Sequence, residues 1–133
     1  FCSGLFIDKK KEKIAAQKQV DALATKTPSV DQLVVNLSGG NQQKVVIAKW
    51  LMEDCDVIIL DEPTRGIDVG AKSEIYGLMT ELVKKGKGVI MISSEMPEII
   101  GMCDNVIIMH ERRMVGKLER EELSQQKIMS YCT

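Results

Sequence analysis

Two stretches of sequence decide the fold of this chain. The first is Leu37-Ser38-Gly39-Gly40-Asn41-Gln42-Gln43-Lys44, and the second is Val57-Ile58-Ile59-Leu60-Asp61-Glu62-Pro63-Thr64. Consecutive glycines let a backbone approach a ligand without a Cβ atom in the way, and the free N–H groups of the helix that follows bind anions. An apolar strand that ends in two carboxylates offers ligands for a hard cation and a group that orients water. The pair predicts a site for a nucleoside triphosphate.

Strands and helices alternate along the rest of the sequence. Helices are expected over 9–25, 41–52, from Asp68 to about residue 85, and over 95–101; strands are expected at 57–60, 89–92 and 106–109, with a further strand at 114–118 after a turn at Arg112-Arg113. The third helix carries one apolar stripe, formed by Ile75, Leu78, Met79, Leu82 and Val83. This order predicts an α/β fold with a mainly parallel sheet and buried-type strands.

Composition and missing motifs narrow the function. The formal net charge is −1, there are one Trp, two Tyr and two Phe, and the four cysteines are scattered, so nothing indicates a nucleic-acid surface or a disulfide framework. The longest strongly apolar runs fall far short of the roughly 18 residues that span a membrane. The loop Gly-x-x-x-x-Gly-Lys-[Ser/Thr] is absent, because the nearest stretch, 66–73, has the wrong spacing. Since the chain begins at Phe1, we expect a piece of a longer protein.

The two stretches resemble the signature motif and the Walker B strand of ATP-binding cassette (ABC) ATPases, in that family's order and spacing. The resemblance implies a partial P-loop NTPase core, RecA-like, with a mainly parallel sheet and a remnant of the helical subdomain. Within residues 1–133, it assigns 1–54 to that remnant and the signature helix. Residues 55–133 become the half of the core that carries Walker B, the D-loop and the switch.

The resemblance also implies roles for individual residues. Asp61 would hold Mg²⁺ and Glu62 would polarise the attacking water. The residues that would touch ATP bound to a partner cassette are Ser38, Gly39, Gly40 and Asn41. Asp68 matches the D-loop aspartate. Simpler readings remain open, in which Ser38 and Asp68 only cap helices and Asp61-Glu62-Pro63 is a polar turn.

One position departs from the family pattern. Ser94 stands where most ABC ATPases have a switch histidine, and a serine has no imidazole to offer to the γ-phosphate. Ser94 could instead cap the following helix. The chain's one histidine, His110, follows a later strand and is expected to face solvent in a turn.

The wording of 38–44 and 62–72 resembles the second, C-terminal cassette of bacterial monosaccharide importers of the ribose, galactose and xylose type. This implies an ATPase that uses ATP and Mg²⁺ at the cytoplasmic face of the cell membrane. Its partners would be another ATPase cassette, transmembrane permease subunits and, indirectly, a sugar-binding protein, with no nucleic acid. Without the phosphate loop, the 133 residues alone are expected to be inactive and, with an unpaired strand edge, to self-associate.

Three other classes of protein agree less well with the sequence. A chromosome-maintenance ATPase shares a similar signature loop but calls for coiled-coil heptads before it, which residues 1–36 lack. An ABC factor of translation, with an RNA partner, fits poorly with Thr64-Arg65-Gly66-Ile67-Asp68. The third class is a non-enzymatic interaction module. That interpretation would apply to these 133 residues alone and not to a longer protein that contains them.

Overall fold

The computed structural model describes residues 2–3, 6–53 and 55–132. The chain divides into two units, 1–91 and 92–133. Each unit holds its own set of buried apolar side chains. The candidate residues from Ser38 to Asp68 all lie in the first unit, whereas Ser94 and His110 lie in the second.

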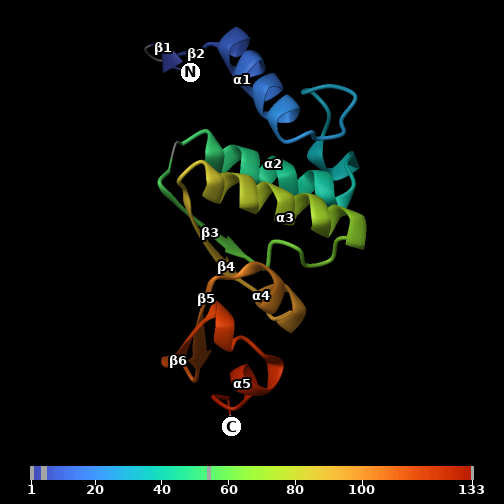
Figure 1. The fold of residues 1–133 in the computed structure, drawn as a ribbon. Helices are drawn as coiled ribbons and strands as arrows, with labels where there is room; N and C mark the ends of the chain where they lie inside the picture. The colour runs from blue at the N-terminus through green and yellow to red at the C-terminus, as the bar shows by residue number, and fades with distance from the viewer. Residues whose placement is uncertain (1, 4–5, 54, 133) are drawn as a thin grey trace. The chain divides into compact units, whose positions relative to one another are not determined.

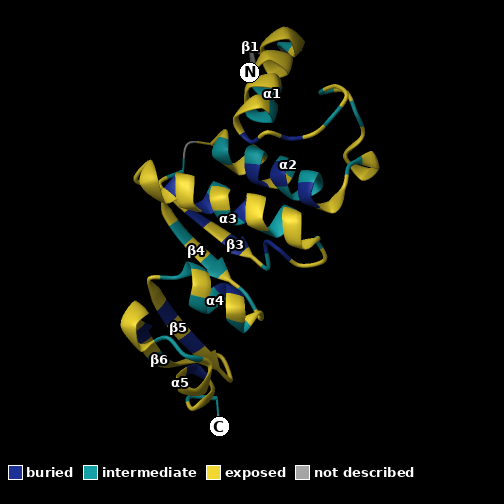
Figure 2. Ribbon diagram, turned by 45° about the vertical axis from the view of Figure 1, so that its right-hand side comes forward, coloured by how far each residue is buried: buried dark blue, intermediate teal, exposed yellow. Residues whose placement is uncertain are grey.

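The first helix, α1 (Lys9–Ala22), is exposed, as its charged sequence predicted. It starts at Asp8, whose carboxylate accepts hydrogen bonds from the backbone N–H groups of Lys10 and Lys11. None of its residues is buried (Figure 2). Two short antiparallel strands that the sequence did not predict, β1 (Cys2–Ser3) and β2 (Phe6–Ile7), precede it.

The helices α2 (Gly39–Leu51) and α3 (Val69–Lys84) lie side by side (Figure 1). A short 3₁₀ turn, η1 (Val34–Asn36), leads into α2. On α3 the predicted apolar stripe is confirmed at Ile75, Met79 and Leu82, which are buried. Its last member, Val83, is wrong, since 51% of that residue is exposed. Consecutive residues point about 100° apart around a helix axis, so Val83 falls at the edge of the face that buries Leu82.

The predicted parallel sheet is present as two strands, β3 (Val57–Asp61) and β4 (Gly88–Ile92). The backbone N–H of Gly88 donates to the carbonyl of Asp56 at 2.8 Å, so both strands begin at the same end. Along β3 the side chains alternate, with Ile58 and Leu60 buried and Val57 and Ile59 exposed. The prediction that such runs are buried on both faces is therefore wrong for the described chain, because only one face of β3 is covered.

The second unit is built on an antiparallel hairpin. Its strands are β5 (Asn105–His110) and β6 (Arg113–Glu119), preceded by the helix α4 (Met96–Met102) and followed by the 3₁₀ turn η2 (Arg120–Glu122) and the helix α5 (Gln125–Met129). The core of the unit consists of Val106, Ile108, Leu118 and Ile128.

The hairpin confirms the predicted turn but corrects the partner of the strand at 106–109. That strand pairs antiparallel with β6, His110 opposite Arg113, instead of extending the parallel sheet. The turn residues Glu111 and Arg112 both have positive φ, 45° and 66°. Two such residues give the backbone twist that a two-residue hairpin needs, so the chain returns at once beside β5.

Candidate functional site

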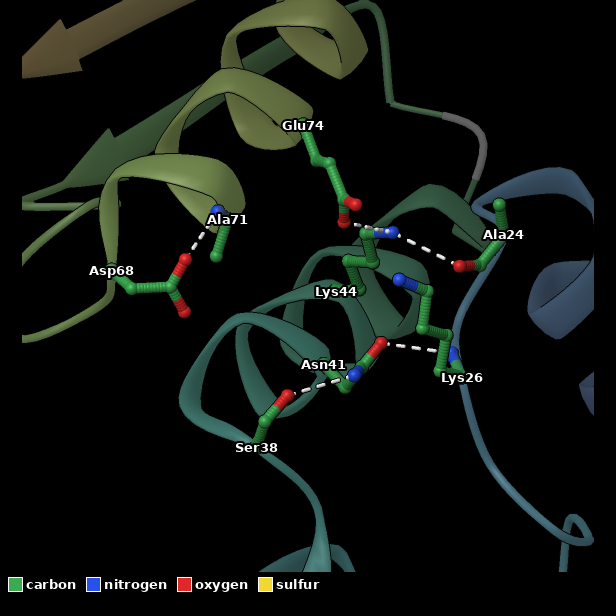
Figure 3. A network of polar contacts seen from close by, with 8 residues as sticks. All are labelled: Ala24, Lys26, Ser38, Asn41, Lys44, Asp68, Ala71 and Glu74. Carbon is green, nitrogen blue, oxygen red and sulfur yellow. Dashed lines mark hydrogen bonds and ion pairs between the residues drawn. The ribbon is translucent and has the colours of Figure 1, made fainter.

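Ser38 is the N-cap residue of α2, with an extended backbone and no hydrogen bond from its side chain to the helix. Its hydroxyl oxygen instead accepts a hydrogen bond from the side-chain amide of Asn41 at 2.8 Å. The amide oxygen of Asn41 accepts from the backbone N–H of Lys26, also at 2.8 Å (Figure 3). The reading of Ser38 as the residue that caps α2 is thus confirmed for its backbone, although its side chain makes no capping bond, and its exposed hydroxyl keeps a hydrogen to donate.

The two glycines of this stretch differ in their surroundings. Gly39 is exposed, and a Cβ atom there would come within 3.2 Å of Cγ2 of Ile67. Gly40 is buried, and a Cβ atom there would overlap the Cβ of Ala71 on α3. Close packing of α2 on α3 therefore requires glycine at position 40, and the sequence alone did not indicate this contact.

Lys44 is a buried cation that the sequence analysis did not single out. Its ammonium donates to the carbonyl of Ala24 at 3.0 Å and lies 2.8 Å from a carboxylate oxygen of Glu74 (Figure 3). The hydrogen bond from Lys44, and then its charge, lower the pKa of Glu74 below its ordinary value. The available signal was spacing, because Lys44 stands one helical turn after the buried Gly40 and shares its face.

The two carboxylates end the strand β3. Asp61 is its last residue and is exposed, while Glu62 follows it, half-buried, with a φ of +46°. A backbone hydrogen bond of 3.1 Å from Arg65 to the carbonyl of Glu62 closes the turn, and Pro63 and Thr64 beneath it are buried. The left-handed conformation is costly for a residue with a Cβ atom, and such residues cluster at functional sites.

The donor set at this turn suits magnesium. An exposed carboxylate at a strand end gives a hard oxygen ligand, and Mg²⁺ in nucleotide sites takes one or two carboxylates, waters and substrate phosphates. Among the described residues there is no cluster of three potential ligands that would form a complete protein cage. Asp61 therefore fits a cation that also binds phosphate.

Asp68 caps α3. One oxygen of its carboxylate accepts a hydrogen bond from the backbone N–H of Ala71 at 2.9 Å (Figure 3). The simpler reading of Asp68 as a helix cap is confirmed. The side chain remains exposed, so its other oxygen is open to a second partner.

Ser94 lies in the second unit, in a bend after β4. The expectation that it caps the next helix is wrong, because the N-cap residue of α4 is Glu95. The local hydrogen bonds come from Ser93, whose hydroxyl accepts from the backbone N–H of Glu95 at 3.0 Å and donates to Glu98 at 2.8 Å. His110 is exposed at the end of β5, as expected for a solvent-facing residue.

A mainly apolar pocket of about 220 Å³ lies elsewhere in the first unit. Residues of α1, the segment 25–37 and α2 form its walls, and neither Asp61, Glu62 nor Ser38 lines it. In the part of the chain that the structure describes, no helix is both long enough and apolar enough to cross a bilayer.

Comparison with known proteins gives the family context of this geometry. The family described as "ABC transporter" matches residues 6–65. The xylose import ATP-binding protein of Thermoanaerobacter pseudethanolicus is 63% identical over 117 residues, which are 88% of this chain and 23% of that protein. The ribose import ATP-binding protein of Clostridium tetani is 52% identical over 126 residues, which are 95% of this chain and 25% of that protein.

Solved structures agree on the fold. An inward-facing metal-chelate type ABC transporter superposes with a TM-score of 0.83 at 19% identity, covering 97% of this chain and 52% of that one. A dimeric bacterial ABC transporter cassette gives 0.72 at 21% identity, covering 90% and 51%. The chain has the ABC transporter cassette fold and is homologous to sugar import ATP-binding proteins.

This partial cassette spans about a quarter of the length of the curated relatives it matches. Within its first unit, the structure places Ser38 and Asp68 at the starts of two neighbouring helices, and Asp61 and Glu62 at the carboxyl end of β3. Ligands of parallel α/β sheets bind beyond that end of the strands. Asp61 and Glu62 therefore lie at the end of the strand beyond which ligands of such sheets bind.

Proposed function

We propose that the protein containing this chain is the ATP-hydrolysing subunit of an ABC importer for monosaccharides. The observation that carries the proposal is the geometry of the first unit, in which the exposed Ser38 lies at the start of α2, and the exposed Asp61 and half-buried Glu62 lie at the end of β3. The 63% identity to a xylose import protein supports the substrate class, and it favours an importer over the chromosome-maintenance and translation alternatives.

Within that protein, the chain would be the C-terminal part of the second cassette. The sequence of residues 38–44 and 62–72 supports this position. Residues 1–54 would then belong to the helical subdomain and the signature helix, and 55–133 to the core. The protein would act at the cytoplasmic face of the membrane with permease subunits, and a sugar-binding protein would deliver the sugar.

Each residue has a defined task in this proposal. Asp61 presents its exposed carboxylate to Mg²⁺, and Glu62 orients the attacking water and accepts its proton. When bound, Mg²⁺ neutralises charge on the phosphates as the terminal phosphoryl group leaves. Ser38 donates its hydroxyl hydrogen to the ATP held by the partner cassette, with Gly39, Gly40 and Asn41 shaping the loop around it. Asp68 offers its free oxygen across the same interface.

Ser94 makes the two ATP sites of the dimer unequal in this proposal. The site built on Glu62 lacks an imidazole at the switch position and would be slow or mainly structural. Ser38 serves the other site, whose catalytic carboxylate belongs to the partner cassette. The chain would thus contribute its signature to the faster site.

Experiments on the reconstituted transporter test both the proposed activity and the proposed inequality of the two ATP sites. Full-length protein with its permease in liposomes should couple ATP hydrolysis to uptake of a pentose or hexose, and absence of both ATP binding and uptake contradicts the proposal. Ser38→Arg should nearly abolish turnover, while Ser73→Arg, an equally exposed serine on α3, should not. Glu62→Gln should cost much less than the roughly 10²–10⁴-fold expected for loss of a working general base. If Glu62→Gln alone stops hydrolysis, the asymmetry is assigned the wrong way round.

A further inference from the structure

Two contacts join α2 and α3 in a fixed register. On α2 the buried residues Gly40, Lys44 and Ile47 are four and three positions apart, so they share one face. Gly40 meets Ala71. Lys44 meets Glu74, three positions after Ala71 on α3 (Figure 3). The later residue of α2 meets the later residue of α3, so the two helices run in the same direction and start at the same end.

The contact between Gly40 and Ala71 sets how closely the helices approach. A Cβ atom on Gly40 would overlap the Cβ of Ala71, so no other residue fits at position 40 without separating the helices or shifting one along the other. Close-packed interiors do not absorb such an overlap, and the distance between helix axes depends on the side chains at the contact. Glycine is therefore required at position 40 by the packing of α2 against α3 within the same chain.

The contact between Lys44 and Glu74 fixes the register one turn further along. Only 5% of the Lys44 side chain is exposed, and its ammonium has two oxygen partners, on Glu74 and Ala24. Sliding α2 along α3 would break the ion pair and leave a buried ammonium without its carboxylate, which is strongly unfavourable. The register is therefore held by charge as well as by shape.

We infer that Gly40, Ala71, Lys44 and Glu74 are positioning residues, which hold Ser38 and Asp68 as one rigid pair. Ser38 precedes Gly40 by two residues, and Asp68 precedes Ala71 by three, so each lies within one turn of the Gly40–Ala71 contact. The second glycine of the signature is required for packing on α3 of its own chain, independently of any approach to a ligand. This inference rests on the proposed function, because it assigns Ser38 and Asp68 a shared task in nucleotide hydrolysis.

A compensating pair of substitutions separates packing from ligand contact. Gly40→Ala adds the overlapping methyl group, and Ala71→Gly removes the atom that it would strike. In full-length transporter, Gly40→Ala should lower kcat about 10²-fold by misplacing Ser38, with little change in the KM for ATP. Ala71→Gly alone is the reference background, because glycine weakens α3 by itself, and the double variant should recover most of the lost kcat relative to it.

Thermal unfolding of the same four proteins reads the packing without any nucleotide. Gly40→Ala should lower Tm, and the double variant should regain most of the loss. If Gly40→Ala does not fold at all, the double variant should still fold. A double variant as inactive or as unstable as Gly40→Ala overturns the inference. If wild-type protein neither binds nor hydrolyses ATP, the proposed function fails, while the Tm values still report whether Gly40 packs on Ala71.

Discussion

The ammonium of Lys44 and the carboxylate of Glu74 form an ion pair across two helices, with unequal exposure of its members. The Lys44 side chain is 5% exposed and the Glu74 side chain 47%. Removing Glu74 would leave the buried Lys44 ammonium with its hydrogen bond to the Ala24 carbonyl but without this carboxylate, whereas removing Lys44 leaves a carboxylate that water can solvate. The signature helix therefore depends more on Glu74 than the exposure of Glu74 indicates.

Acid should weaken this link in a defined direction. The pKa of Glu74 is lowered by the hydrogen bond and then the charge of Lys44, from an ordinary value of 4.5. The pair's contribution to stability is thus fully present above that ordinary value, and it is lost as the pH falls through the lowered pKa. Full-length protein carrying Lys44→Met should lose less stability on acidification than wild type does.

Carboxyl-carbon NMR of selectively labelled protein checks this directly. Lys44→Met should return the pKa of Glu74 towards its ordinary value. Lys49→Met, on the same helix but with its ammonium 5.8 Å from the Trp50 ring, should leave it low. Wild-type Glu74 titrating at its ordinary pKa would show that the ion pair does not persist in solution.

Backbone strain at Glu62 predicts that a glycine variant is more stable than an alanine variant at this position. Because φ is +46° there, a residue with a Cβ atom is unfavourable in the folded state by about 1–2 kcal/mol relative to glycine. After the greater freedom of glycine in the unfolded chain is subtracted, Glu62→Gly should be about 0.5–1 kcal/mol more stable than Glu62→Ala. Denaturant unfolding of the intact protein measures the difference.

Arg65 provides the matched control for Glu62. It lies in the same turn and is exposed, and its φ is not among the positive values found in the described chain. There the order should reverse, with the alanine variant more stable than the glycine variant. An identical order at both positions would mean that Glu62 carries no strain.

Asp68 allows capping and nucleotide chemistry to be separated. Asp68→Ala removes the acceptor of the 2.9 Å bond from Ala71 and should cost about 1 kcal/mol. Asp68→Asn keeps a capping oxygen, so stability should remain near wild type. The proposed role across the interface predicts that the asparagine variant still loses ATPase activity, by roughly tenfold or more, because one charge-assisted contact is gone. Full activity in a stable Asp68→Asn protein would limit Asp68 to capping.

Local patterns in the sequence predicted the local structure well. The helices at 9–22, 39–51 and 69–84 and the strands at 57–61 and 88–92 follow from apolar spacing, capping residues and glycine stops, all of which act within a few residues. The local turn from β5 into β6 was predicted, but the separation of β5 from the parallel sheet was missed, because pairing between segments far apart in the sequence is not encoded in periodicity. The Lys44–Glu74 pair and the overlap of Gly40 with Ala71 were missed for the same reason.

The carboxylates of the site were placed correctly at the end of a strand, but their backbone was not. Nothing in the order of residues distinguishes the left-handed Glu62 from the extended Asp61 before it. The following Pro63 favours an extended backbone at Glu62, so the left-handed conformation runs against the local preference. Such a departure from local preference is expected where function outweighs stability.

The shared direction of α2 and α3 gives their neighbouring starts opposite electrostatic character. Each helix carries about half a positive charge at its N-terminus from its aligned peptide dipoles. At α3 the carboxylate of Asp68 already compensates that charge, whereas at α2 the N-cap is the neutral Ser38 (Figure 3). The start of α2 therefore keeps a partial positive charge, whereas the start of α3 carries a net negative one.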